Sequence, residues 1–166
     1  LSNGEISIVF DPFFNGNTWE KAKPEDIKCQ YIFISHGHGD HYGDADLIGK
    51  ANDALVISTA EVAHKAEEAG LKAHAMHLGG KHDFEFGSIR LTPAFHGAGI
   101  PGGHAAGVIV TFYDKTLYFA GDTAFFSDMQ YLNRFGQLDY ALLPIGDNFT
   151  MGPEDALLAA SLIKAA

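Results

Sequence analysis

The sequence predicts a mixed α/β fold in which sheets pack together and helices lie on the outside. Residues 6–10 alternate between the two faces of a strand, and the continuous apolar run at 31–34 is typical of a strand buried on both faces. A predicted strand at 54–57 leads directly into a predicted helix at 60–69, whereas the turn at 113–116 joins two strands as a hairpin. Both kinds of connection therefore occur in one chain.

The remaining elements follow from the same patterns. Strands are predicted at 6–10, 31–34, 54–57, 72–76, 83–86, 89–95, 107–113, 116–120 and 140–144. Helices are predicted at 45–51, 60–69 and 127–134, and from Pro153 to the last residue, Ala166. Ser127 and Gln130 predict a capping box, and Pro153 followed by two acidic residues is typical of a helix start. The stretches 12–24 and 35–44 are predicted as loops.

Length and charge restrict the class of protein. The chain of 166 residues predicts a single domain, 1–166. Its net charge of -10 disfavours nucleic acid as a partner, and it has no apolar run near the roughly 18 residues of a membrane span. The single cysteine, Cys29, cannot form an internal disulfide, so we expect a cytoplasmic protein. We expect a small-molecule substrate, and a homo-oligomer stays an open alternative.

The loop after the predicted strand 31–34 carries the strongest chemical signal. His36, His38, Asp40 and His41 lie within six positions, separated by two glycines that let the chain curl around an ion. Residues two apart in extended chain point to one side, so His36 and His38 favour a shared ligand. Imidazole and carboxylate groups are ligands that zinc prefers, with manganese and iron as alternatives. A polar turn with Asp40 as a helix cap explains only part of this pattern.

Three further polar residues follow predicted strands. His96 comes after the strand 89–95, Asp122 after 116–120 and Asp147 after 140–144. Each taken alone fits a surface histidine or a turn-forming aspartate. If the strand ends meet at one edge, His96 and Asp122 converge with the histidine loop, and Asp147 becomes a candidate for binding substrate.

These residues together carry a family resemblance. The pattern HxHxDH at 36–41, the later His96 and the Gly-Asp pair at 121–122 resemble the metallo-β-lactamase superfamily. Asp-Pro-Phe at 11–13, Gly-Gly at 79–80, Phe-Ala-Gly-Asp-Thr at 119–123 and the stretch 144–155 resemble a group of small metal-dependent hydrolases similar to the L-ascorbate-6-phosphate lactonases. The resemblance covers essentially the whole chain.

The resemblance implies an αββα sandwich and two divalent metal ions. By it, the first ion is bound by His36, His38 and His96, and the second by Asp40 and His41, with Asp122 bridging the two. The family pattern also has a final histidine and an early Gly-His-Ser-like turn, and this sequence has neither. We therefore expect a chain truncated at both ends, whose second metal binds more weakly than its first.

A binuclear metal site of this kind predicts a hydrolase that uses a metal-bound hydroxide. The substrate would be an ester, lactone, amide or phosphoester, and Asp40 is the candidate for orienting the hydroxide or receiving its proton. An iron-dependent redox enzyme, a nuclease on the same fold and a non-catalytic metal-binding module are the alternatives.

Overall fold

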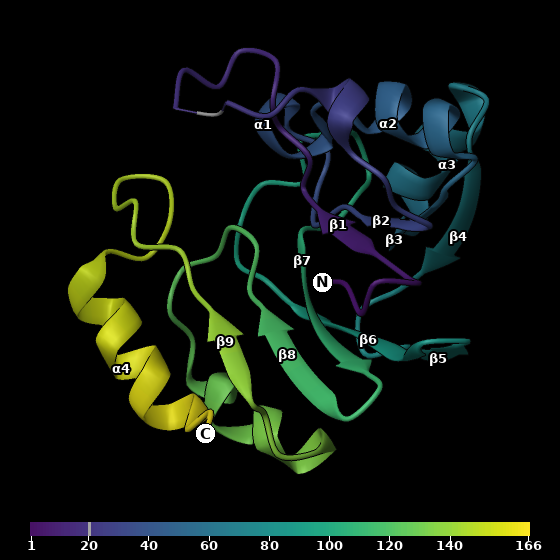
Figure 1. The fold of residues 1–166 in the computed structure, drawn as a ribbon. Coiled ribbons are helices and arrows are strands. Elements are labelled where there is room, and N and C mark those ends of the chain that lie inside the picture. The colour runs from purple at the N-terminus through teal and green to yellow at the C-terminus, as the bar shows by residue number, and fades with distance from the viewer. Residues whose placement is uncertain (20) are drawn as a thin grey trace. The chain divides into compact units, whose positions relative to one another are not determined.

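The computed structural model describes residues 1–19 and 21–166, which divide into two compact units. One unit comprises residues 1–77 and 98–104, and the other comprises 78–97 and 105–166. Each unit contains a sheet with helices packed on it, which confirms the predicted mixed α/β class (Figure 1). Residue 20, within the predicted loop 12–24, lies outside the described residues. Whether the chain acts as one domain stays a prediction.

The first unit is built on a parallel sheet. Among its described residues, the strand order is β1 (Ile8–Phe10), β2 (Tyr31–Phe33), β3 (Leu55–Thr59) and β4 (Lys72–Met76). The connecting segments contain η1 (Pro24–Asp26), α1 (Gly39–Tyr42), α2 (Ala45–Asn52) and α3 (Ala60–Glu68). Parallel neighbours require crossover connections, which explains why strands and helices alternate here. The carboxyl ends of these strands consequently lie at one edge of the sheet.

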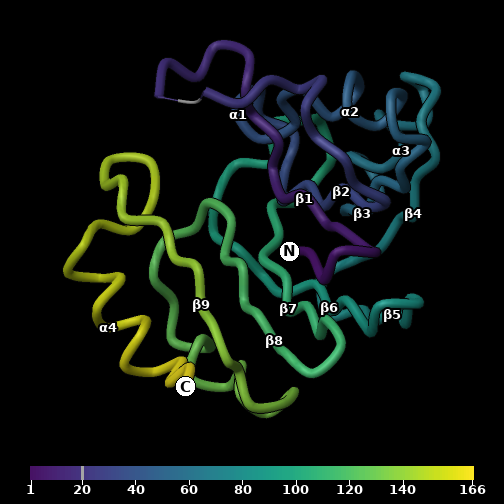
Figure 2. Tube along the Cα trace, in the orientation of Figure 1, coloured from purple at the N-terminus to yellow at the C-terminus, as the bar shows by residue number. Residues whose placement is uncertain are grey.

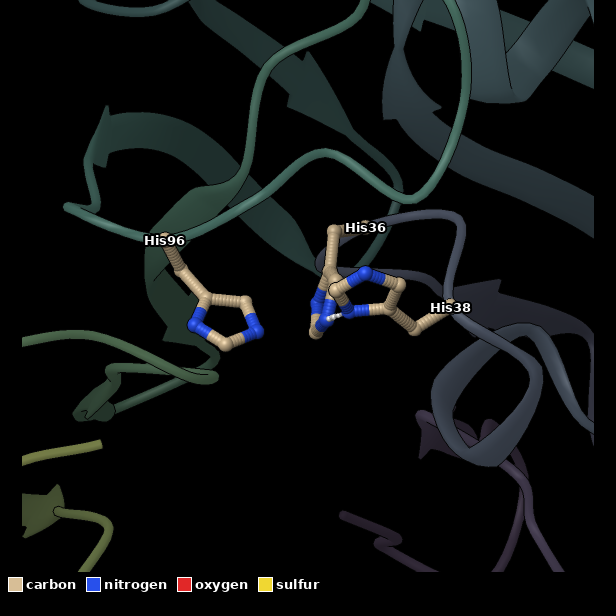
Figure 3. A group of neighbouring side chains, drawn as sticks. All are labelled: His36, His38 and His96. Carbon is tan, nitrogen blue, oxygen red and sulfur yellow. Dashed lines mark hydrogen bonds between the residues drawn. The ribbon is translucent and has the colours of Figure 1, made fainter. Parts of the chain in front are cut away.

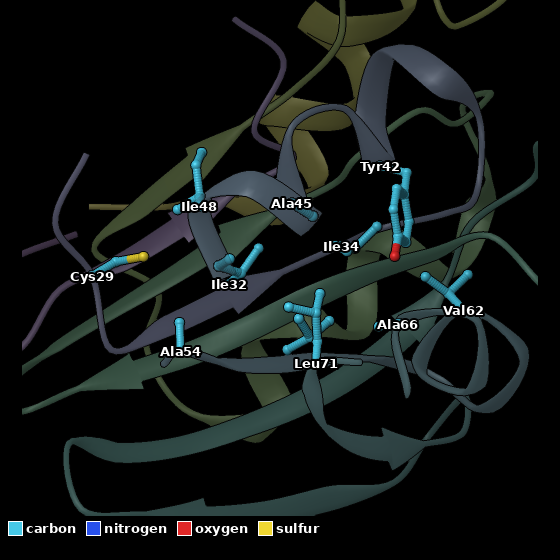
Figure 4. Packing of buried hydrophobic residues seen from close by; sticks show 11 residues of the cluster. Cys29, Ile32, Ile34, Tyr42, Ala45, Ile48, Ala54, Val62, Ala66 and Leu71 are labelled. Atoms are coloured by element: carbon cyan, nitrogen blue, oxygen red, sulfur yellow. The ribbon is translucent and has the colours of Figure 1, made fainter. Parts of the chain in front are cut away.

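The core of the first unit lies between its sheet and its helices (Figure 4). Ile32 and Val56 of the sheet are fully buried, as are Ile48 of α2 and Val62 of α3. The apolar positions of each helix recur at helical spacing, so each helix places one stripe against the strands. This packing fixes the strand ends from which the histidine loop departs.

The second unit is mostly antiparallel. Its described strands follow the order β5 (Lys81–Phe84), β6 (Gly87–Pro93), β7 (Ala106–Phe112), β8 (Lys115–Phe119) and β9 (Tyr140–Leu142). Figure 2 traces β6, β7 and β8 as a meander, and β9 then pairs parallel to β8. The helices η2 (Ser127–Phe135) and α4 (Pro153–Ile163) bury Met129, Leu132 and Ala159 against Ile109 and Tyr118 of the sheet.

Two of the predicted helix ends are wrong. Ser127 does not cap its helix, because η2 is a 3-10 helix that begins at Ser127 itself, and Gln130 Nε2 donates to Ser127 O at 3.0 Å instead. The final helix stops at Ile163 rather than Ala166, because Lys164 adopts the left-handed conformation with φ 52°. The backbone N–H of Ala166 then donates to Leu138 O at 2.9 Å.

The loop predicted at 35–44 also contains a helix. The short helix α1 lies within it, where the sequence predicts no regular structure. The strand predicted at 83–86 begins earlier, at Lys81. Among the described residues, none of the helices has the length and apolarity needed to cross a bilayer.

Substitutions at two neighbouring positions of α2, one buried and one exposed, should differ clearly in their effect on the free energy of unfolding. Ile48→Ala should lower the free energy of unfolding by about 2–5 kcal/mol, because it leaves a cavity at a fully buried position. Leu47→Ala is the matched control, since Leu47 is 55% exposed and its truncation should change stability by less than about 0.5 kcal/mol. Urea unfolding monitored by circular dichroism measures both, and equal midpoints for the two variants would contradict this core assignment.

Candidate metal centre

The histidine loop leaves the sheet at the carboxyl end of β2. Gly37 N–H donates to Ala98 O at 2.8 Å, which holds the loop against the segment 98–104 of the same unit. Gly99 has a φ of 65°, and a Cβ there would overlap the backbone nitrogen of His38. Only glycine permits so close an approach, so the two loops fix each other's backbone.

His36 and His38 face each other across this loop (Figure 3). The His36 ring is fully buried, and its Nε2 lies 2.9 Å from Nδ1 of His38. The rings meet nearly edge to face, with their centroids 4.7 Å apart. Two imidazole nitrogens at this distance either share one hydrogen or direct both lone pairs at a cation. Two nitrogen ligands of tetrahedral zinc would lie about 3.4 Å apart. A small increase in the distance between these two ring nitrogens would therefore let both bind one ion.

His41 lies beside this pair and is held by Asp11. Its Nδ1 lies 2.7 Å from Asp11 Oδ2, and its ring centroid is 4.1 Å from that of His36. Asp11, His36 and His41 each offer a donor atom within 4.8 Å of the others. The opposite nitrogen of His41, Nε2, lies 3.9 Å from Asp40 Oδ2. Asp40 is 65% exposed at its side chain, so this carboxylate is accessible to solvent and ligands.

His96 and Asp122 lie together in the second unit. His96 Nε2 is 3.6 Å from Asp122 Oδ2, and both side chains are largely buried. The loops that carry them are joined, because Phe95 N–H donates to Thr123 Oγ1 at 3.0 Å and Ala124 N–H donates to Phe95 O at 3.1 Å. Two residues 26 positions apart are thus brought into one pair.

Asp147 lies in a turn after β9. Asp147 and Asn148 have φ values of 59° and 49°, and Asn148 N–H donates to Asp147 Oδ1 at 2.9 Å. The turn is exposed, and Thr150 N–H donates to Asp147 O at 3.2 Å. The turn-forming role expected of an aspartate is therefore present, and a role in substrate binding stays a prediction.

The sequence interpretation missed Asp11 as a partner of the histidines. It used Asp11 only as part of the Asp-Pro-Phe stretch at 11–13 that carries the family resemblance. Asp11 contacts Ser35 and His41, which are 24 and 30 positions away, so no local spacing reveals the contact. The usable signal is its place directly after β1, the strand that pairs with β2.

Cys29 belongs to the core rather than to a reactive site. Its side chain is buried, and this burial raises the pKa of the thiol from the usual 9.0 to about 11. Because the thiolate is the nucleophilic form, a raised pKa makes the folded protein unreactive at neutral pH.

The comparisons with known proteins identify the family of this chain. Residues 7–166 match a family described as the beta-lactamase superfamily domain. A UPF0173 metal-dependent hydrolase of Natranaerobius thermophilus is 51% identical over 164 residues, covering 99% of this chain and 74% of the relative. The UPF0173 metal-dependent hydrolase YtkL of Bacillus subtilis is 49% identical, covering 95% and 74%. Among solved structures, the metallo hydrolase Igni18 of Ignicoccus hospitalis superposes with a TM-score of 0.90 at 31% identity, covering 99% of this chain and 73% of its own.

The Cys29 environment predicts slow thiol labelling. At pH 8 a chromogenic disulfide reagent should label Cys29 only after denaturant is added, since the folded thiol has a pKa of about 11. The unfolded chain ionises first, so this group should lower stability as the pH rises from 9 towards 11. Immediate labelling of the native protein at pH 8 would show that the thiol is accessible.

Proposed function

The chain belongs to the beta-lactamase superfamily, and within it to the UPF0173 metal-dependent hydrolases, and from this premise we propose that it hydrolyses a small-molecule substrate at a two-metal site. The bond attacked is that of an ester, lactone, amide or phosphoester. The net charge of -10 disfavours a polyanionic substrate such as nucleic acid. We further propose a cytoplasmic location, because the chain's single cysteine is a free, buried thiol.

His36, His38 and His96 are the proposed ligands of the first ion (Figure 3). The observation that carries this proposal is the His36–His38 pair, in which a buried ring nitrogen lies 2.9 Å from the nitrogen of its neighbour. His96 supplies a third imidazole from a strand end, beside the carboxylate of Asp122. Three imidazoles form the donor set that catalytic zinc prefers, with manganese and iron as alternatives.

Asp40 and His41 are the proposed ligands of the second ion, with Asp122 shared between the two ions. The support is that His41 Nδ1 lies 2.7 Å from Asp11 Oδ2, so the hydrogen of the neutral ring is on Nδ1 and Nε2 carries the lone pair that a metal would use. That nitrogen lies 3.9 Å from Asp40 Oδ2, a separation that lets both atoms bind one ion after a small shift.

The chemistry is divided between the ions and the chain. When bound, such ions lower the pKa of a water ligand towards about 7 and polarise the substrate oxygen under attack. Asp40 has two carboxylate oxygens and an exposed side chain, so we assign it to orient the attacking water and accept its proton. His36 is fully buried and hydrogen-bonded to Ser35 and His38, which holds its ring in one orientation.

Hydrolysis by this site should depend on both metal and Asp40. A chelator should abolish turnover of a nitrophenyl ester or phosphodiester, and Asp40→Ala should lower kcat/KM by about 10²–10⁴-fold, since it removes a proton acceptor. Steady-state kinetics with metal content measured by mass spectrometry tests both effects.

His64→Ala is the matched control for this experiment. The His64 side chain is 72% exposed and pairs with the neighbouring carboxylates of Glu67 and Glu68, and its loss should leave kcat/KM unchanged. Full activity in metal-free protein would refute the metal mechanism, and full activity of Asp40→Ala would refute the role of that carboxylate.

A further inference from the structure

We propose that Asp11 and Ser35 are positioning residues that set the ring tautomers of His41 and His36, and thereby choose which nitrogens are open to metal. This inference rests on the proposed function for the identity of the metal ligands. It depends on hydrogen bonds within the first unit, all of which join described residues.

The Asp11 carboxylate receives three hydrogen bonds. Ser35 N–H donates to Oδ1 at 2.7 Å, Ser35 Oγ donates to Oδ2 at 2.6 Å, and His41 Nδ1 donates to Oδ2 at 2.7 Å. The side chain is 7% exposed, so water competes little for these positions. Asp11 itself adopts a φ of 41°, and its N–H donates to Phe33 O at 2.9 Å. A residue held in this uncommon conformation is fixed by its surroundings.

The bond to Asp11 determines the tautomer of His41. A carboxylate only accepts hydrogen bonds, so the hydrogen of the neutral ring must be on Nδ1. Nε2 then carries no hydrogen, and this is the nitrogen that lies 3.9 Å from Asp40 Oδ2. A carboxylate that orients a histidine in this way is a common partner of metal-binding imidazoles.

The hydrogen bond from Ser35 to Asp11 also determines the tautomer of His36. The serine hydroxyl has one hydrogen, which it donates to Asp11 Oδ2. Its oxygen must therefore accept from Nδ1–H of His36, which lies 2.9 Å away. His36 Nε2 is then free of hydrogen, so in the metal-free protein the hydrogen between the two rings belongs to His38 Nδ1.

Asp11 is a positioning residue rather than a ligand. Its donor atom lies within 4.8 Å of those of His36 and His41, so a direct metal role is the competing interpretation. However, Asp11 Oδ2 already accepts two hydrogen bonds, from His41 Nδ1 at 2.7 Å and from Ser35 Oγ at 2.6 Å, and a metal ion there would displace both donors. Both carboxylate oxygens are already occupied by donors.

Asp11→Asn should invert both tautomers. The backbone N–H of Ser35 can only donate, so the amide oxygen must remain opposite it, and the amide N–H2 group replaces Oδ2. His41 Nδ1 then accepts and its hydrogen moves to Nε2. Ser35 also becomes an acceptor from asparagine and donates its own hydrogen to His36 Nδ1. Nitrogen-15 NMR of the metal-free chain, with labelled histidine, reads the tautomer of each ring directly.

The change of tautomer in Asp11→Asn should be accompanied by a loss of zinc affinity. Calorimetric titration of Zn²⁺ into Asp11→Asn should show binding weakened by about 10–100-fold, which is typical for loss of a residue that orients a metal-binding histidine. Ser35→Ala should alter the tautomer of His36 alone and leave His41 unchanged, because it removes only the link to His36.

Asp44→Asn is the matched control. Asp44 is also a buried carboxylate with three donors, Phe14 N–H, Asn15 N–H and the Asn15 side chain, and none of these three donors is a histidine. It should keep the histidine tautomers and the zinc affinity of the parent protein even if stability falls. A general effect of losing a buried carboxylate would instead appear equally in Asp44→Asn and Asp11→Asn.

The outcomes separate this inference from the proposed function. Parent tautomers and parent zinc affinity in Asp11→Asn would overturn the inference, as would equal changes in Asp44→Asn. If Asp11→Asn does not fold, Ser35→Ala decides, and an unchanged His36 tautomer there overturns it. The tautomers are measured without metal, so a parent protein that binds no zinc refutes the proposed function while the NMR result still tests the positioning role.

Discussion

The carboxylate of Asp11 is the constraint on which the histidine loop depends. It joins the end of β1 to the loop after β2, since it accepts from both the backbone and the hydroxyl of Ser35 and from His41. The parallel pairing of Phe10 with Phe33 brings these two strand ends level. The sheet therefore helps to fix the shape of the histidine loop through the Asp11 side chain, in addition to the support from Ala98 and Gly99.

The second unit uses a different geometry to bring its polar residues together. In an antiparallel meander alternate strands run in the same direction, so β6 and β8 end at the same edge while β7 between them begins there. His96 and Asp122 follow these two ends and lie 3.6 Å apart. Because β9 runs parallel to β8, the turn containing Asp147 also follows an end at that edge.

Much of this arrangement was predictable because it follows from local patterns. The strand β4 occupies the predicted residues 72–76, and the apolar spacing of α2 and α3 located both helices to within a few residues. The histidine loop is compact enough in sequence to be recognised as a candidate metal site. What could not be predicted depends on tertiary context: the 3-10 geometry of η2, the left-handed Lys164 that ends α4, and the long-range bonds of Asp11.

The close contact between Gly99 and His38 bears on whether this loop can be transplanted. A graft of residues 35–41 into a foreign scaffold would carry the histidines. It would lose the backbone of Ala98 and Gly99, which contacts Gly37 and His38. It would also lose Asp11, which is supplied by another strand. A designer would need to move three separate chain segments with their relative positions intact. The loop therefore depends on its host sheet, and its histidines alone do not form a module that can be moved to another protein.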